Sequence, residues 1–194
     1  MDFIFLQKIT AVIFLFLFFS IRFLWTYMGG KRKKVKVTKE IIGGRFWITN
    51  IVYIFLPFIL IFDFSNLFNI RIFSHYHFVL YLIGVLSSLF GLILMFMARF
   101  HRLKDWGYMG DDTGNILFTK GVYSITRHPY YMGALFLGVG VYLVLNSWLI
   151  LTMFPVFLFV SKVIKKEDDF LFDKFDGEWM NYKKHVGIIP FLGF

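Results

Sequence analysis

The stretch Gly121–Gly133, GVYSITRHPYYMG, is a short polar turn between strongly apolar segments. Pro129 has no backbone N–H to lose at the first position of a helix, so we expect a helix to begin there. Arg127 and His128 then stand at the positive end of a helix dipole, where a cation is disfavoured and an anion is favoured. The alternative interpretation is an Arg127 that reaches lipid phosphate, with His128 as a polar cap.

The composition places this turn in a membrane protein. Of 194 residues, 58% are hydrophobic, 22% are aromatic and 28 are Phe, more apolar surface than a water-soluble domain of this length can bury. The net charge of +9 lies in basic patches beside apolar runs, which predicts contact with anionic lipid and no nucleic-acid partner. The absence of cysteine excludes disulfides, thiolate metal sites and a Cys nucleophile. The histidines lack ligand spacing with carboxylates, so no metal site is expected.

Upstream of the turn, the apolar runs 3–28, 46–64 and 78–98 predict three membrane spans, because a span needs about 20 helical residues. No cleavable signal is expected, since Asp2 precedes the first run and no basic segment comes before it. Residues 31–39 and the segment directly after the third run are rich in Lys and Arg. By the basic-inside rule, the first and third loops are cytoplasmic and the second is external.

Downstream of the turn, the apolar arms 130–145 and 148–160 are joined by Asn146-Ser147 and are short for full spans, which predicts a tight helical hairpin. Both its ends then face the cytoplasm. Beyond it, one face of an amphipathic helix is expected against the membrane or the protein, formed by Phe172, Phe175, Trp179, Tyr182 and Val186, with Gly177 as an interruption.

The expected fold class is therefore all-α. We expect a multi-pass transmembrane helical bundle of about five membrane helices, the last two a tight hairpin, plus a C-terminal amphipathic interfacial helix. Residues 1–98 would hold the first three spans and residues 99–194 the chemistry, within one membrane domain. Small residues spaced along the third and fourth membrane helices predict that these two helices touch, which places Arg127 near the cytoplasmic end of the third. These residues are Gly84, Ser88 and Gly91 on one helix and Ala134 and Gly138 on the other.

A second charged cluster, Glu167-Asp168-Asp169, is expected where the fifth helix leaves the membrane, again with the sign that the helix dipole disfavours. A solvated charged face is the alternative, because Lys165 and Asp169 form an i,i+4 pair. The hairpin returns the chain to the membrane face that it left, so this cluster can meet Arg127-His128. The two clusters would then cancel each other's penalty or bind a zwitterion together.

Tyr123, Tyr130 and Tyr131 flank the basic cluster. These tyrosines form either an interfacial aromatic belt or an aromatic wall that contacts a cation or stacks on a purine. Both interpretations stay open.

The order of these blocks resembles a known family. GVYSITRHPYYMG, an apolar hairpin, an acidic pair and then FDGEWMNYKKHVGIIP are similar to the isoprenylcysteine carboxyl methyltransferase family, whose pattern reads R-H-P-x-Y-x-G, E-E and F-G-x-E-Y-x-x-Y. The phospholipid N-methyltransferases share a looser version. The resemblance implies an integral membrane methyltransferase that uses S-adenosylmethionine, releases S-adenosylhomocysteine and methylates a lipophilic acceptor from the bilayer. It would be a multi-pass protein with its site on the cytoplasmic side, in the plasma membrane of a prokaryote or the endoplasmic reticulum of a eukaryote.

Carried over by position, the resemblance implies that Glu167 and Arg127 are catalytic. It implies a cofactor site of Leu117, Phe118, Gly121, Tyr123, His128, Tyr131, Gly133 and Glu167. A pocket with aromatic faces and a carboxylate suits a sulfonium, and a helix N-terminus with Arg or His suits the carboxylate of the cofactor. The partners expected are a prenylated cysteine or lipid acceptor and membrane lipids, with the chain a monomer or weak oligomer.

The chain also departs from the family pattern. The acid pair is Glu-Asp, Trp179 replaces the first Tyr, Asp176 separates Phe175 from Gly177, and Val163 stands where the family often has a substrate-holding Arg. A carboxylate acceptor needs only a cation to hold it, whereas an amine or thiol acceptor needs Glu167 as a base, and these acceptors all stay open. So do phospholipid or amine N-methylation, a non-catalytic lipid- or sterol-binding protein and, more remotely, a nicotinamide-linked reductase.

Overall fold

The fold is described from a computed structural model, which describes residues 3–29, 78–104 and 117–188. Every regular element in these ranges is a helix. In chain order the elements are α1 (Phe3–Gly29), α4 (Phe78–Lys104), η1 (Gly121–Ser124), α5 (Pro129–Val144), η2 (Trp148–Thr152), α6 (Met153–Phe175) and α7 (Gly177–His185). The all-helical class is confirmed. The predicted second span, 46–64, the basic loop 31–39 and the C-terminal residues 189–194 lie outside the described residues.

Within the described ranges, three helical segments are long and apolar enough to cross a membrane, namely Phe3–Ile21, Phe78–Phe100 and Trp148–Phe175. The first two match predicted spans, although α4 continues to Lys104. Helix α5 has 16 residues and is shorter, reaching about 24 Å at about 1.5 Å per residue. The chain therefore has the helices of an integral membrane protein.

Helices α4 and α5 pack backbone to backbone. A Cβ added to Gly91 would lie 2.5 Å from the Gly133 carbonyl oxygen, and one added to Gly84 would lie 2.8 Å from the Gly140 carbonyl oxygen. Only glycine permits this approach, because any side chain would push the backbones apart. The predicted contact between these helices is confirmed.

The glycines that make this contact on α5 differ from the predicted ones. Gly133 and Gly140 face α4, whereas a Cβ at Gly138 would meet the Met153 side chain instead, and Ala134 packs at the edge of the core shared with α1. The prediction of Gly138 was therefore wrong, because its side of the helix faces Met153. Two stripes of small residues exist on α5, and the spacing along the sequence does not say which one meets α4.

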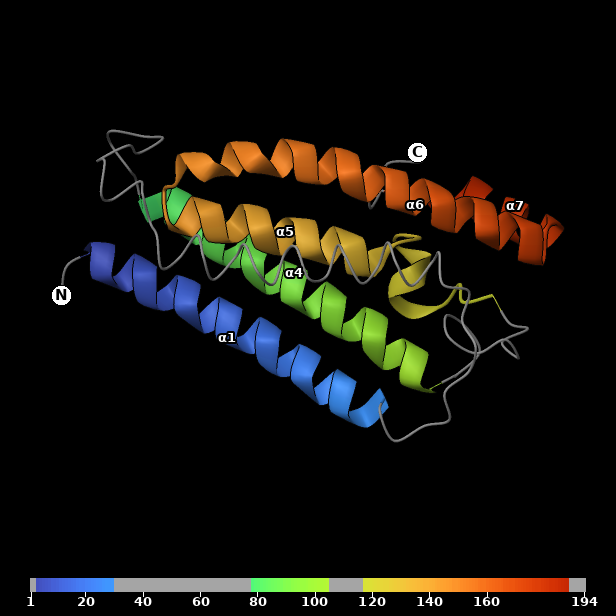
Figure 1. Ribbon diagram of the computed structural model, residues 1–194, viewed down its shortest axis with the longest axis horizontal. Helices are drawn as coiled ribbons and strands as arrows, with labels where there is room; N and C mark the ends of the chain where they lie inside the picture. Colours follow the sequence, from blue (N-terminus) through green and yellow to red (C-terminus); the bar gives the residue numbers. More distant parts are fainter. Residues whose placement is uncertain (1–2, 30–77, 105–116, 189–194) are drawn as a thin grey trace.

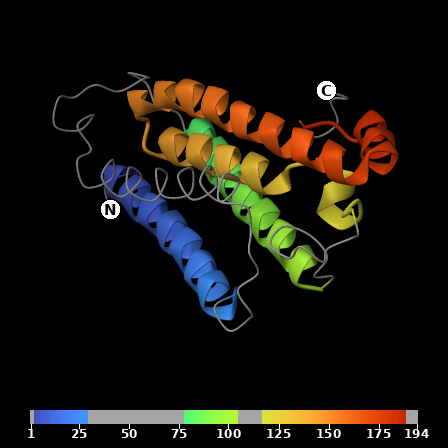
Figure 2. The same ribbon diagram turned by 45° about the vertical axis from the view of Figure 1, so that its right-hand side comes forward.

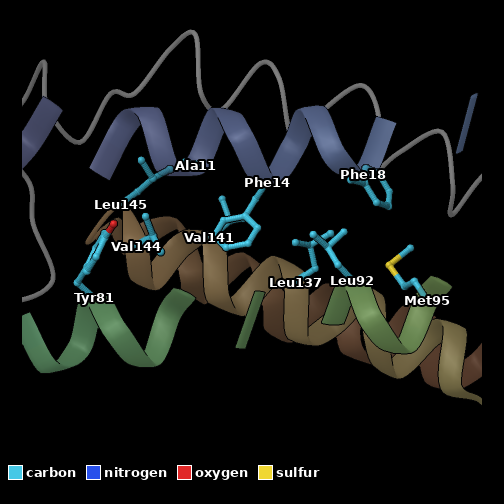
Figure 3. Close-up of a cluster of buried hydrophobic side chains, with 10 residues drawn as sticks. All are labelled: Ala11, Phe14, Phe18, Tyr81, Leu92, Met95, Leu137, Val141, Val144 and Leu145. Carbon is cyan, nitrogen blue, oxygen red and sulfur yellow. The ribbon is translucent and has the colours of Figure 1, made fainter. Parts of the chain in front are cut away.

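The main apolar core lies where α1 covers the α4–α5 pair (Figure 3). Its side chains come from all three helices: Ala11, Phe14, Phe18, Tyr81, Leu92, Met95, Leu137, Val141, Val144 and Leu145. Large apolar side chains elsewhere on these helices are exposed, such as Phe16 at 69% and Phe23 at 71%, as expected of a surface that lipid covers. The core joins α1 to the region that carries the charged turn.

Helix α6 runs back alongside α5 in both views (Figures 1 and 2). The chain reverses at Asn146, which has a φ of 50°, and at Ser147, whose side chain accepts a hydrogen bond from the Leu149 N–H. Helix α6 is longer than predicted, because it continues through the charged cluster to Phe175. Its buried residues, Val160, Ile164, Glu167, Asp168 and Leu171, repeat at helical spacing and form one continuous stripe.

The predicted end of this helix at Glu167-Asp168 was therefore wrong. Both acids lie inside α6, where its dipole contributes little. The sequence becomes polar at that point, but buried residues continue at helical spacing beyond it. The helix therefore continues as well.

The expected C-terminal amphipathic helix is divided. Helix α6 ends at Phe175, Asp176 adopts a φ of 41°, and α7 begins at Gly177. Trp179 and Tyr182 of α7 are buried and pack with Leu171 of α6. Phe172 was expected on the same face but is exposed. Helix α7 thus packs on the protein, beside the C-terminal end of α6 (Figure 1).

Candidate active site

The turn before α5 has the predicted form. His128 is the N-cap residue with φ −126° and ψ 59°, and Pro129 occupies the first turn. Arg127 and His128 are both buried, at 6% and 4% exposure, directly before a helix of 16 residues. Two potential cations therefore stand at the positive end of α5, away from water, and this placement requires an anionic partner.

Asp168 of α6 supplies that partner. The Arg127 Nη1 donates to its Oδ2 at 3.1 Å, and the His128 Nε2 lies 2.6 Å from its Oδ1. The predicted meeting of the basic and acidic clusters is confirmed. Unit charges about 4 Å apart attract by about 4 kcal/mol at an effective dielectric of about 20, which exceeds the dipole cost of about 1 kcal/mol at a helix end.

Glu167 forms a second link between the same helices. The Tyr131 hydroxyl donates to its Oε2 at 2.9 Å, and Glu167 is 5% exposed. His128 and Tyr131 are three residues apart, so they share the face of α5 that meets α6. Their ring centroids are 5.9 Å apart. Two neighbouring acids on α6 thus meet Arg127, His128 and the Tyr131 phenol at the start of α5.

Aromatic side chains line the Arg127 side of this cluster. The guanidinium carbon lies 5.8 Å from the centroid of the Trp179 ring, within the range of a cation–π contact. The Arg127 Nε is buried and has no hydrogen-bond partner among the described residues. A buried donor in this position can serve an additional acceptor.

Tyr123 lies beside the cluster rather than within it. Its hydroxyl donates to the Ala98 carbonyl of α4 at 3.3 Å, and its own carbonyl accepts from the Tyr182 hydroxyl. Because Ala98 lies near the end of α4, the charged turn is near that end of the helix, as predicted. Burial raises the pKa of the Tyr182 phenol, which favours its neutral, hydrogen-bond-donating form.

The remaining candidate residues spread around the cluster. Leu117 packs against the Leu171–Trp179–Tyr182 cluster, and the Phe118 ring meets the Tyr123 ring edge-on at 5.8 Å. Gly121 begins η1 with a φ of 66°. The close approach at Gly133 is to α4, where an added Cβ would lie 2.7 Å from the Met95 Cγ. A cofactor role for these four residues stays a prediction.

Sequence reasoning emphasised Glu167 and gave Asp168 no separate role. The structure shows Asp168 as the residue that binds both Arg127 and His128. A signal for it was present, since Asp168 follows Ile164 by four residues and precedes Leu171 by three, on the stripe that α6 buries. Thr126, at 0% exposure, was also missed, and its residue type gives no signal outside the fold.

A family model described as phospholipid methyltransferase matches residues 79–177, which include α4, α5 and α6 and both charged clusters. The match covers half of the 194 residues. The chain belongs to the phospholipid methyltransferase family. The charged cluster described above thus lies within the region that defines the family.

Two proteins similar to this chain are protein-S-isoprenylcysteine O-methyltransferases. The protein from Saccharomyces cerevisiae is 30% identical over 120 aligned positions, covering 55% of this chain and 50% of the relative. The protein from Xenopus laevis is 29% identical over 116 positions, covering 57% of this chain and 40% of the relative. The chain spans half or less of the length of these relatives. The resemblance to isoprenylcysteine methyltransferases is confirmed.

Proposed function

We propose that the protein is a multi-pass membrane methyltransferase that uses S-adenosylmethionine to methylate a lipophilic acceptor from the bilayer, with its site on the cytoplasmic side. The observation that carries the proposal is the buried charged cluster in the region matched by a methyltransferase family. We further propose about five membrane helices, with α5 and α6 as a hairpin, and a cofactor site within residues 99–194.

The residues of the cluster fit this cofactor. Arg127 retains a buried Nε–H without a partner among the described residues and stands at a helix N-terminus, which suits the carboxylate of the methionine part. Glu167 and the Tyr131 ring suit a sulfonium or ammonium cation. The bound cofactor supplies an electrophilic methyl group. The protein would contribute position and exclusion of water, since displacement requires donor and acceptor about 3–3.5 Å apart.

The acceptor is proposed as either a carboxylate or an amine. A carboxylate of a prenylated cysteine is favoured by the named relatives. An amine-bearing phospholipid is the second candidate. Val163, one turn before Glu167, is half-buried and packs against the cluster of Tyr131, Val160 and Ile164, so this position offers no cation to an acceptor carboxylate. Glu167 would then take the proton of the amine.

The test is the binding of S-adenosylmethionine to the purified full chain in lipid nanodiscs, compared between wild type, Glu167→Gln and Glu178→Gln. The amide of Glu167→Gln can still accept the Tyr131 hydroxyl but lacks the charge, so we expect at least tenfold weaker binding, about 1.4 kcal/mol. Glu178 is exposed on α7, and its variant should bind as wild type does. Isothermal titration calorimetry gives the affinities.

Methyl transfer from labelled cofactor into total lipid, or into a prenylcysteine analogue, separates the two acceptors. No detectable binding of the cofactor to wild type in both detergent and lipid would refute the proposed function. Binding without transfer to any lipid or prenylcysteine would favour the non-catalytic interpretation. Tighter binding of NADPH than of S-adenosylmethionine would favour a reductase.

A further inference from the structure

The residues that follow α7 return to the charged turn. We call residues 186–188 the C-terminal strap. The Gly187 carbonyl accepts the Arg127 N–H at 3.0 Å, and the Ile188 carbonyl accepts the Thr126 hydroxyl. The Ile188 side chain packs against the Tyr131 cluster between α5 and α6. The strap thus reaches both the backbone of the turn and the helix pair that carries the acids.

Thr126 joins the strap to the N-terminus of α5. It is fully buried at 0% exposure, and its hydroxyl also accepts the His128 N–H at 3.3 Å. A hydroxyl has one donor hydrogen and acceptor lone pairs, so it can make both bonds at once. One oxygen atom therefore connects the strap to the residue that caps α5.

The backbone N–H groups of the turn depend on these bonds, because α5 offers them no acceptor. Pro129 provides no N–H, and the His128 side chain makes no capping bond to α5, since it faces Asp168 instead. The backbone N–H groups of Arg127 and His128 lie before the helix and have no partner within it. They are satisfied by Gly187 of the strap and by Thr126.

We propose that Thr126 is a positioning residue: its hydroxyl couples the C-terminal strap to the Arg127-His128 turn and so holds both side chains against Asp168. The proposal rests on the proposed function only in that these side chains would bind the cofactor. Thr126→Val keeps the volume and removes both hydrogen bonds, whereas Thr126→Ser keeps the hydroxyl. Neither change alters a residue placed in the binding machinery.

Thr10 provides a matched control on the far side of the core. Its hydroxyl donates to the Leu6 carbonyl at 2.8 Å and lies 2.8 Å from the Tyr81 hydroxyl, so Thr10→Val also removes two polar contacts. These contacts belong to α1 and α4, away from the charged turn. A loss of stability common to both threonine variants can therefore be separated from an effect on the turn.

The experiment measures hydrogen exchange in the peptide containing the Arg127 and His128 amides, and the affinity for S-adenosylmethionine, for the full chain in nanodiscs. For Thr126→Val we expect exchange at least tenfold faster and binding about tenfold weaker, since two hydrogen bonds are lost. Thr126→Ser should remain within about threefold of wild type for both. Thr10→Val should leave both readouts unchanged.

The proposal is overturned if Thr126→Val exchanges in this peptide no faster than Thr10→Val, or if Thr126→Ser behaves as Thr126→Val does. If Thr126→Val loses its fold, shown by full exchange in the α1 peptides, Thr126→Cys replaces it under the same criteria, because a thiol donates only weakly. If wild type binds no cofactor, the proposed function fails, while the exchange data still decide the role of Thr126.

Discussion

At the scale of single residues, Asp168 is the hub of the charged cluster. Its two carboxylate oxygens are divided between Arg127 and His128, and its side chain is 9% exposed. Its neighbour Asp169 is exposed, because the next residue on an α-helix lies about 100° further around the axis. Consecutive acids of similar chemistry thus have very different surroundings, which allows a direct comparison between them.

Asp168→Asn should destabilise the protein by about 3 kcal/mol or more, because it leaves a buried guanidinium without its counter-charge. It should also abolish binding of S-adenosylmethionine, since Arg127 and His128 lose their common anchor. Asp169→Asn, as the control, should change neither quantity by more than about 0.5 kcal/mol. Thermal unfolding in detergent and calorimetry measure the two effects, and equal effects of both variants would contradict the role given to Asp168.

The stability of the folded protein should depend on pH through Tyr182. Burial raises the pKa of its phenol in the folded protein above the ordinary value of 10.0. Below that pH both the folded and the unfolded protein keep the phenol proton, so the stabilisation from this group is complete. As the pH rises above it, the unfolded state loses the proton first and stability falls by up to about 1.4 kcal/mol per pH unit.

Tyr182→Phe should therefore cost about 1 kcal/mol at neutral pH through the lost bond to the Tyr123 carbonyl. This deficit should shrink as the pH rises from about 9 to 11, because phenylalanine does not titrate. Unfolding midpoints of both proteins across this range provide the measurement. A deficit that is constant with pH would show that the phenol is not buried in its neutral form.

At the scale of elements, the α4–α5 contact and the buried stripe of α6 position the cluster. The glycine contact sets how closely α5 approaches α4, and the stripe from Val160 to Leu171 turns both acids of α6 toward α5. The spacing of small residues predicted that such faces exist on α4 and α5, whereas the buried stripe of α6 was not predicted. Which of two small-residue faces meets α4 was decided by the packing of Met153 and of α1 on the other faces of α5.

A series of glycine-to-alanine changes tests this contact. Gly91→Ala should destabilise the protein by about 1–3 kcal/mol, because the new Cβ meets the carbonyl oxygen of Gly133 and the backbone of Leu137, neither of which can move without separating the helices. Gly138→Ala should cost less, since the obstacle there is the flexible Met153 side chain. Gly177→Ala, with nothing within 4 Å of its Cβ, should be tolerated.

Unfolding midpoints in one detergent rank these three variants. The contact would be placed wrongly if Gly91→Ala were as stable as Gly177→Ala. A Gly138→Ala variant less stable than Gly91→Ala would restore the face that the sequence alone suggested.

At the scale of the whole molecule, the arrangement of α5, α6 and α7 gathers the candidate residues at one end of the helical assembly (Figure 2). The turn before α5, the middle of α6, helix α7 and the C-terminal strap all meet there. Residues widely separated in sequence, such as Arg127 and Gly187, are joined by hydrogen bonds. The site therefore forms only when the helices and the strap of the C-terminal half pack against one another.

The sidedness of this end is a prediction from the basic loops. The chain contains no cysteine, so single cysteines report their location without background. Lys33→Cys and Lys183→Cys should be labelled by a membrane-impermeant maleimide only from the cytoplasmic side, and Asn66→Cys only from the opposite side. Labelling of intact and inverted vesicles measures this, and labelling of Lys183→Cys together with Asn66→Cys would refute the proposed topology.

The sequence by itself determined the apolar helices, the start of α5 at Pro129 and the presence of two charged clusters that a hairpin could bring together. These features depend on local chemistry: the length of apolar runs, a missing N–H and the sign of charges near helix ends. The tertiary structure alone decided that Asp168 binds both Arg127 and His128, that Gly133 and Gly140 meet α4, and that Thr126 binds the strap. The physical reason is that hydrogen bonds and close packing depend on how each helix is rotated against its neighbours, and a repeating pattern along one chain leaves that rotation open.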